Sequence, residues 1–394
     1  MENIVSRKRI PSLDLLRGLV MMLMALDHTR DYFHYDAFIF DPTDLKQTTV
    51  PIFFTRFITH YCAPVFCFLA GTSSFLAGQN QNRNSLSSWL LKRGFWLIFA
   101  EITIIKLAWY FKLDYSFIDL AVIWSLGVSM VFLSGIIRLS QSIAIAVAFA
   151  FVFCHNLLDG IAPVPDTLLG KIWILFHVQE ELKLGTISVH VIYPVLPWIG
   201  LMTLGYYFGQ LYTPSFDGNK RQKILIRTGI TLILLFLFFR IPNLYGDLHP
   251  WTLQDSLSKN ILAVLNVTKY PPSFAYICIT MGPALLLLAL FEKASGAFAQ
   301  VFITVGQVPM FFYILHIYAI HLIALFAATA TGYHFTDMIL DTWVGFSPNL
   351  KGYGFTLFGA YLVWGFILIL LYPLCKKYND YKKNNKAKWW LSYL

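Results

Sequence analysis

A segment near the N-terminus places two carboxylates, an arginine and a histidine around one apolar run. Asp14 and Arg17 precede the run 19–26, and His28 and Asp31 follow it. At 3.6 residues per turn, Arg17 and His28 differ by only about 20° around a helix axis, and all four side chains share one face. A neutral imidazole can act as a base or as a nucleophile near pH 7. The segment therefore predicts a helix whose histidine performs proton or group transfer.

The apolar run also indicates where this chemistry takes place. A charge near the centre of a bilayer costs from about 2.5 to more than 10 kcal/mol, so intramembrane charges face a cavity or a partner. The helical rise of about 16 Å between Arg17 and His28 sets the arginine toward the cytoplasm and the histidine toward the far half of the membrane. Two alternatives stay open: Asp14 and Arg17 pair at i,i+3 only to help the helix insert, and His28 is a structural residue.

A second group of polar residues lies in the next apolar run. Arg56 and His60 are four residues apart and share a helical face. Pro64 is expected to break this helix, so that freed backbone groups line a cavity. Either Arg56 or His60 can stabilise an oxyanion or grip a phosphate, and an interhelical hydrogen bond is the alternative role for His60. The sequence contains no HExxH motif, nucleotide-binding glycine loop or acidic calcium loop, and no metal is expected.

The elements that must position these residues are membrane helices. Of the 394 residues, 57% are hydrophobic and 13% are charged, against roughly 25% charged in a soluble domain. We therefore predict an all-α integral membrane bundle of about ten transmembrane helices, forming a single domain over 1–394. At about 20 residues per span, the predicted helices are 12–34, 51–78, 88–111, 117–137, 140–158, 186–212, 222–241, 271–291, 299–327 and 353–374.

The distribution of lysine and arginine predicts the orientation of the bundle. Basic residues cluster in alternate connections and in the tail 376–394, so this side, with both termini, is expected to be cytoplasmic. The formal net charge of +9 falls in these clusters rather than along a soluble face, which argues against nucleic acid as a partner. The longer loops, 35–50, 159–185, 242–270 and 328–352, face the other side. Loops at the mouth of a bundle often recognise substrate, although a protective cap is the alternative.

Several short motifs are spread along most of the chain. They are SLDLLRG (12–18) followed by Asp27-His28, HYCAPVF (60–66), LAGTS (69–73), KRG (92–94), IWSLG (123–127), YPVLPWIG (193–200), KYPPS (269–273) and GQVPMFFYILH (306–316). Together these motifs resemble the heparan-α-glucosaminide N-acetyltransferase-like family of membrane proteins. The spacing of Arg17 and His28 is also similar to that of bacterial membrane O-acyltransferases of surface polysaccharides.

Both resemblances imply transfer of an acyl group, usually acetyl from cytoplasmic acetyl-coenzyme A, to a sugar amine or hydroxyl beyond the membrane. The arginine spacing favours His28 as the base or acyl carrier. The glycine-rich stretch and the following histidine of the animal lysosomal enzyme are replaced here by residues 27–31 and, a little later, His34, so the choice of histidine stays open. His34 is the second candidate by its distance from Asp27, and His60 is the third. Asp31, at i+3 from His28, is a candidate to orient its ring. Asp27 is included in this candidate catalytic group.

Donor and acceptor sites are expected on different residues. Coenzyme A carries several phosphate charges and needs cations at its entry, although Lys92 and Arg93 also fit a purely topological role. The predicted donor-binding set comprises Arg17, Asp14, Arg56, Arg93 and Lys92. The predicted acceptor-binding set comprises Trp198, His190, Lys269 and His316. Trp198 can stack on a sugar or simply anchor at the membrane interface.

The sequence thus predicts a membrane acyltransferase, placed in the inner (plasma) membrane of a bacterium. Its expected partners are the lipid bilayer, acetyl-coenzyme A, a glycan or amino-sugar acceptor and, as one option, a second copy of the chain. The rival hypothesis is a proton-coupled transporter that uses the same Asp, His and Arg residues as a proton relay for a small solute. That transporter would cleave no thioester.

Overall fold

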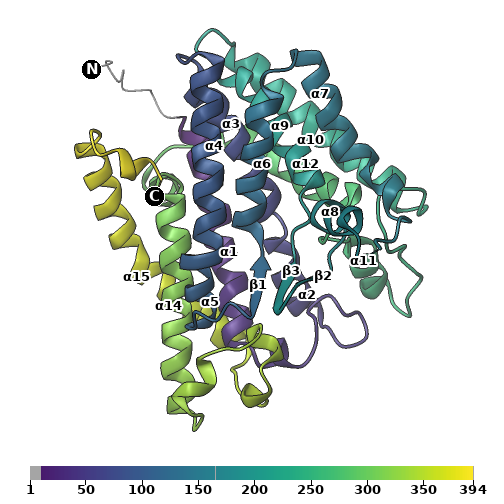
Figure 1. Cartoon of the computed structure of the whole chain (residues 1–394), viewed down its shortest axis with the longest axis vertical. Helices are drawn as coiled ribbons and strands as arrows, with labels where there is room; N and C mark the ends of the chain where they lie inside the picture. Colours follow the sequence, from purple (N-terminus) through teal and green to yellow (C-terminus); the bar gives the residue numbers. More distant parts are fainter. Residues whose placement is uncertain (1–9, 165, 394) are drawn as a thin grey trace.

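The computed structural model describes residues 10–164 and 166–393. Most of this part of the chain is helical (Figure 1). The helices are α1 (Pro11–Phe33), α2 (Val50–Thr59), α3 (Cys62–Gly78), α4 (Arg83–Ala100), α5 (Lys106–Tyr110), α6 (Val122–Ile136), α7 (Gln141–Phe149), α8 (Leu168–His177), α9 (Leu196–Phe208), α10 (Gly218–Arg240), α11 (Leu257–Leu265), α12 (Phe274–Phe291), α13 (Ala297–Gly306), α14 (Pro309–Ala330) and α15 (Leu357–Asn384).

Six segments of the described residues are long and apolar enough to cross a membrane. They are Val50–Gly78, Gln141–Leu158, Gly218–Arg240, Phe274–Phe291, Pro309–Ala330 and Leu357–Asn384. Each coincides with a predicted run. The other four predicted runs contain α1, α4, α6 and α9. α1 is as long as a membrane span but carries five charged residues. The count of ten spans and the cytoplasmic termini stay predictions.

A small sheet departs from the all-α prediction. Its strands β1 (Phe117–Leu120), β2 (Glu181–Leu184) and β3 (Ile187–Val191) have the order β1-β3-β2, with β1 parallel and β2 antiparallel to β3. The predicted helices 117–137 and 186–212 therefore each begin as a strand. Their apolar, partly β-branched starts read as helix by composition alone, and only pairing between distant segments selects a strand.

The break in the second run also differs from the prediction. α2 ends at Thr59 and α3 begins at Cys62, so the chain breaks before Pro64 rather than at it. Pro64 lies in the first turn of α3, where a missing backbone N–H removes no helical hydrogen bond.

α1 lies at the centre of the bundle, where it packs against α2, α3, α12, α13, α14 and α15. Its closest neighbour is α13. A Cβ atom on Gly18 would lie 1.9 Å from the Phe302 carbonyl oxygen, and one on Gly306 would lie 1.9 Å from the Asp14 carbonyl oxygen. Two glycines therefore permit backbone contact between these helices, and this contact fixes the position of α1.

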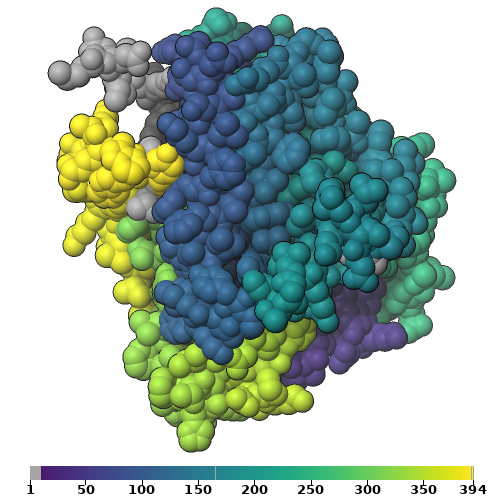
Figure 2. All heavy atoms as spheres, viewed as in Figure 1, coloured from purple at the N-terminus to yellow at the C-terminus, as the bar shows by residue number. Residues whose placement is uncertain are grey.

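The loops after α1 and after α14 cover one end of the bundle. His34, directly after α1, forms an isolated β-bridge with Phe355, and the carbonyl of Ala37 lies beside Gly345. Figure 2 shows this end at the bottom of the view, where the yellow-green loops between α14 and α15 meet the purple segment that precedes α2. These loops partly close the cavity described next.

Candidate functional site

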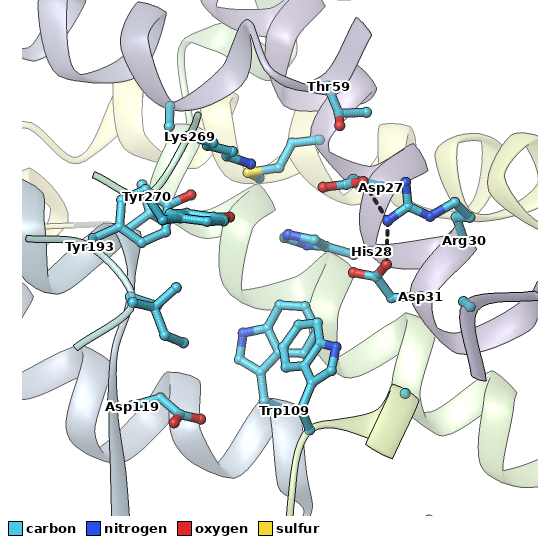
Figure 3. A pocket seen from close by; sticks show the side chains of 18 of the residues that line it. Asp27, His28, Arg30, Asp31, Thr59, Trp109, Asp119, Tyr193, Lys269 and Tyr270 are labelled. Atoms are coloured by element: carbon cyan, nitrogen blue, oxygen red, sulfur yellow. Dashed lines mark hydrogen bonds and ion pairs between the residues drawn. The ribbon is translucent and has the colours of Figure 1, made fainter. Parts of the chain in front are cut away.

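A cavity of about 540 Å³ lies beside the second half of α1. Its walls come from α1, the α2–α3 break, the end of α4 with α5, the sheet, the loop before α12, and α14. Figure 3 shows the His28 ring projecting into this space, with Asp27, Arg30 and Asp31 behind it. A site built from so many separated segments matches the usual form of a small-molecule pocket.

A chain of two hydrogen bonds sets the tautomer of His28. Nδ1 of His28 lies 2.8 Å from Nε2 of His316, and Nδ1 of His316 lies 3.0 Å from the carbonyl oxygen of Phe312. A carbonyl only accepts, so Nδ1 of His316 carries a proton and, in the neutral ring, Nε2 accepts one. His28 therefore donates through Nδ1. Its Nε2 is left with a free lone pair.

Aromatic side chains hold the His28 ring in this orientation. The ring stacks on His316 at a centroid distance of 5.0 Å and meets the indole of Trp109 edge-on at 4.7 Å. Tyr313 makes a second edge contact at 6.4 Å. Such edge-on contacts favour one ring geometry. The histidine is thus placed by α14 and α5 as well as by its own helix.

A network of charges lies directly behind His28. Arg56 donates to the Asp27 carboxylate, which also forms an ion pair with Arg30 at 3.0 Å, and Arg30 donates to Asp31 at 2.6 Å. The expected hydrogen bond from His28 to Asp31 is therefore not formed. Asp31 is held by Arg30, and His316 takes the role that the sequence assigned to the carboxylate.

The opposite wall carries a cation and two phenols. Lys269 lies in the loop before α12, with its ammonium 5.1 Å from the ring centroid of Tyr270, and Tyr270 packs edge-on against Tyr193 at 5.0 Å. In the described part of the chain no carboxylate forms an ion pair with Lys269. In Figure 3 these side chains face His28 across the cavity. A polar ligand between the two walls would meet a basic nitrogen on one side and donors on the other.

The sheet supplies a third wall through Asp119. This carboxylate accepts from Nδ1 of His190 at 2.9 Å and from the hydroxyl of Tyr110. Asp119 and His190 are direct partners in the β1–β3 register, and the hydrogen bond to Asp119 raises the pKa of His190. The side chain of His190 is half-buried and does not line the cavity. It therefore reaches the site only through Asp119.

Three other predicted residues lie near the cavity without lining it. His34 follows the end of α1, with Nε2 3.7 Å from Asp36. His60 ends α2 as a buried side chain against Tyr276, and its Nδ1 has no hydrogen-bond partner among the described residues. Trp198 is buried behind Tyr193, at 5.5 Å between ring centroids, so it supports the wall and cannot stack on a ligand there.

The predicted donor-binding residues are not brought together. Arg17 pairs with Asp14 at 2.8 Å and donates to Ser73, one helix half away from His28. Lys92 lines a separate cavity, and Arg93 lies 4.9 Å over the Trp89 ring. Of this set, only Arg56 contributes to the wall of the His28 cavity. Among the described residues no group of three or more histidines, cysteines and carboxylates could hold a metal ion.

Sequence reasoning missed the aromatic frame of the site. Trp109, Tyr313, Tyr193 and Tyr270 belong to segments where aromatic residues are frequent, so their spacing carries no signal. Tyr313 is one helical turn before His316, which was the only available indication that it faces the same space.

These features define a class: a polytopic helical membrane protein with a histidine-centred cavity that loops partly close at one end. The family model described as heparan-alpha-glucosaminide N-acetyltransferase, catalytic, matches residues 9–240. The chain belongs to this family, which confirms the resemblance seen in the motifs. No curated protein matches the chain. Membership implies a membrane-bound transferase and does not favour the transporter alternative.

Proposed function

We propose that the chain transfers an acetyl group from acetyl-coenzyme A to the amine or hydroxyl of a sugar on the far side of a bacterial plasma membrane. The single observation that supports His28 as the base is its hydrogen bond to His316, because this bond leaves Nε2 unprotonated and turned toward the cavity. The cavity volume of about 540 Å³ suits the reacting ends of two substrates.

The reaction needs one proton acceptor and one place for negative charge. The acceptor nitrogen or oxygen attacks the thioester carbonyl while Nε2 of His28 takes its proton. The carbon–sulfur bond then breaks, and the thiolate leaves with the proton returned by the imidazolium. The products are an amide or ester and free coenzyme A. His316 is a positioning residue in this scheme, since it holds the tautomer without touching substrate.

The opposite wall is assigned to binding and charge stabilisation. Lys269 and the Tyr270 hydroxyl face His28 across the cavity (Figure 3). Donors placed where an oxyanion develops stabilise the transition state more than the ground state. Arg56 donates to Asp27. We therefore assign it to stabilising the cavity wall rather than to binding acetyl-coenzyme A.

The decisive experiment is turnover of radiolabelled acetyl-coenzyme A by protein in lipid nanodiscs with amino-sugar and sugar acceptors. We expect His28→Ala to lower transfer by about 10²-fold or more, the size of a lost general base. His34→Ala is the matched control, because His34 lies outside the cavity wall, and it should retain activity close to that of the wild type.

Two results would overturn the assignment. Loss of activity in His34→Ala with retention in His28→Ala would move the catalytic role to the second histidine. Failure of the wild type to cleave the thioester with any acceptor, together with proton-coupled solute uptake by proteoliposomes, would establish the transporter instead.

A further inference from the structure

A second cavity lies between the first half of α4 and the C-terminal tail. Its volume is about 940 Å³, and it shares no lining residue with the His28 cavity. Five lysines from segments nearly 300 residues apart converge on it: Lys92, Lys382, Lys383, Lys386 and Lys388. The described residues that line this cavity include no aspartate or glutamate. A hollow lined by these lysines favours a negatively charged occupant.

This cavity favours an anion because its lysine side chains carry charges of the same sign, which repel one another. Charges of one sign around a concave surface raise the local potential and concentrate counter-ions there. Lys383 also lies 3.9 Å from Asp380, a contact in which both side chains are half exposed. This contact neutralises little of the charge. An anion in the cavity would relieve the repulsion directly.

Aromatic contacts hold the tail against α4. The Arg93 guanidinium lies between the rings of Trp89, at 4.9 Å, and Tyr393, at 5.7 Å, and Trp96 meets Tyr393 edge-on at 5.9 Å. Cation–π contacts of this kind stabilise by about 0.5–1 kcal/mol at exposed sites and more when desolvated. The cavity thus has a fixed wall on both sides.

Within the tail, Lys388 is oriented by a neighbouring phenol. Its ammonium donates to the Tyr381 hydroxyl at 2.5 Å and lies 4.9 Å from the Tyr381 ring centroid. Trp389, the next residue, is exposed at the cavity rim. The last turn of the chain therefore presents both a cation and an indole to the cavity.

The position of the cavity next to the end of α15 favours a lipid headgroup as the source of the anion. α15 is a candidate membrane span, and its apolar run ends at Leu374, directly before Lys376 and Lys377. Lysine, tryptophan and tyrosine just past such a helix lie at the level of lipid headgroups. Glu101, at the edge of the His28 cavity, is about 14 Å further along α4 than Lys92 and on the opposite helix face. The basic cavity is therefore separate from the acyl-transfer site.

We propose that this basic cavity binds the phosphate groups of anionic phospholipids. The lysine ammonium groups bind the phosphate oxygens, and the indoles of Trp89 and Trp389 lie against the glycerol and upper acyl region. The shared chemistry is that of a phosphate ester, so a soluble nucleotide is the competing source and is tested alongside. The proposal is independent of the transferase function.

The test is native mass spectrometry of protein released from nanodiscs that contain phosphatidylglycerol and phosphatidylcholine. The variant is Lys92→Gln/Lys383→Gln/Lys386→Gln. Its matched control, Lys171→Gln/Lys183→Gln/Lys351→Gln, removes the same charge from lysines outside both cavities. We expect the first variant to lose retained phosphatidylglycerol by about tenfold or more, given the contribution of each interfacial lysine, while the control keeps it.

A second variant distinguishes binding in the cavity from a general effect of surface charge. Trp89→Ala keeps every lysine and should still weaken retention of phosphatidylglycerol. Equal retention in the wild type and the triple lysine variant overturns the proposal. Saturable binding of soluble ADP that depends on Lys92, without selective retention of phosphatidylglycerol, overturns the lipid source in favour of a nucleotide.

Discussion

Arg56 of α2 donates to the carboxylate of Asp27, the residue directly before His28 on α1. Arg30, one turn further along α1, forms an ion pair with the same carboxylate at 3.0 Å. Asp27 is 7% exposed. The ion pair between Arg56 and Asp27 therefore joins α2 to α1 beside the proposed base. The position of His28 depends on this contact between the two helices.

Asp27→Asn is expected to destabilise the protein by about 3–5 kcal/mol, because Arg56 would lose its carboxylate partner and Arg30 would keep only Asp31. The measurement is chemical unfolding in detergent micelles. Asp27→Asn/Arg56→Gln serves as the matched double variant and should recover part of the loss, since it removes the arginine that Asp27→Asn leaves without a counter-charge. Additive losses in the double variant would contradict this account.

His316→Phe is expected to lower kcat by about 10²-fold with KM for acetyl-coenzyme A nearly unchanged. Phenylalanine keeps the ring volume but accepts no proton from Nδ1 of His28, so the free lone pair is no longer fixed on Nε2. Steady-state kinetics in nanodiscs measure both constants. His316→Gln, whose amide oxygen can accept the same hydrogen bond, should restore part of kcat. A rise in KM with unchanged kcat would instead indicate that His316 contacts substrate.

His190 should make stability depend on pH. Its hydrogen bond to Asp119 raises the pKa above the ordinary value of 6.5. Because the folded pKa is the higher one, the stabilisation is fully present below pH 6.5 and is lost as the pH rises through the folded pKa. We expect the difference in melting temperature between the wild type and His190→Gln to be largest below pH 6.5 and to shrink at higher pH. Asp119→Asn should abolish this trend, and an unchanged trend in that variant would refute the pairing.

Gly18→Ala is expected to destabilise the bundle by about 1–3 kcal/mol, since the new methyl group would overlap the Phe302 carbonyl of α13. Gly365→Ala on α15 is the matched control, because no atom lies within 4 Å of its Cβ position. That control should be neutral or stabilising by up to about 1 kcal/mol, as alanine favours helix. Thermal unfolding in detergent compares the two, and equal stability would show that α1 and α13 can separate without cost.

The sequence by itself determined the membrane class, six apolar helices that match predicted runs, the family, and His28 as the leading candidate. Composition and hydrophobic run length carry this information because a bilayer span requires about 20 apolar residues whatever its neighbours are. The helical period also placed His28 and Asp31 on one face, and both line the cavity.

Only the tertiary structure decided which side chains meet. The partner of His28 is His316, 288 residues away, whereas local spacing had suggested Asp31. Arg17 shares a helical face with His28, yet it lies about 16 Å further back along α1, where it pairs with Asp14 and does not line the cavity. Likewise, the strands at 117–120 and 187–191 form only because each supplies hydrogen bonds to the other. Local periodicity fixes the face of one helix, but contacts between distant segments depend on how all the helices pack.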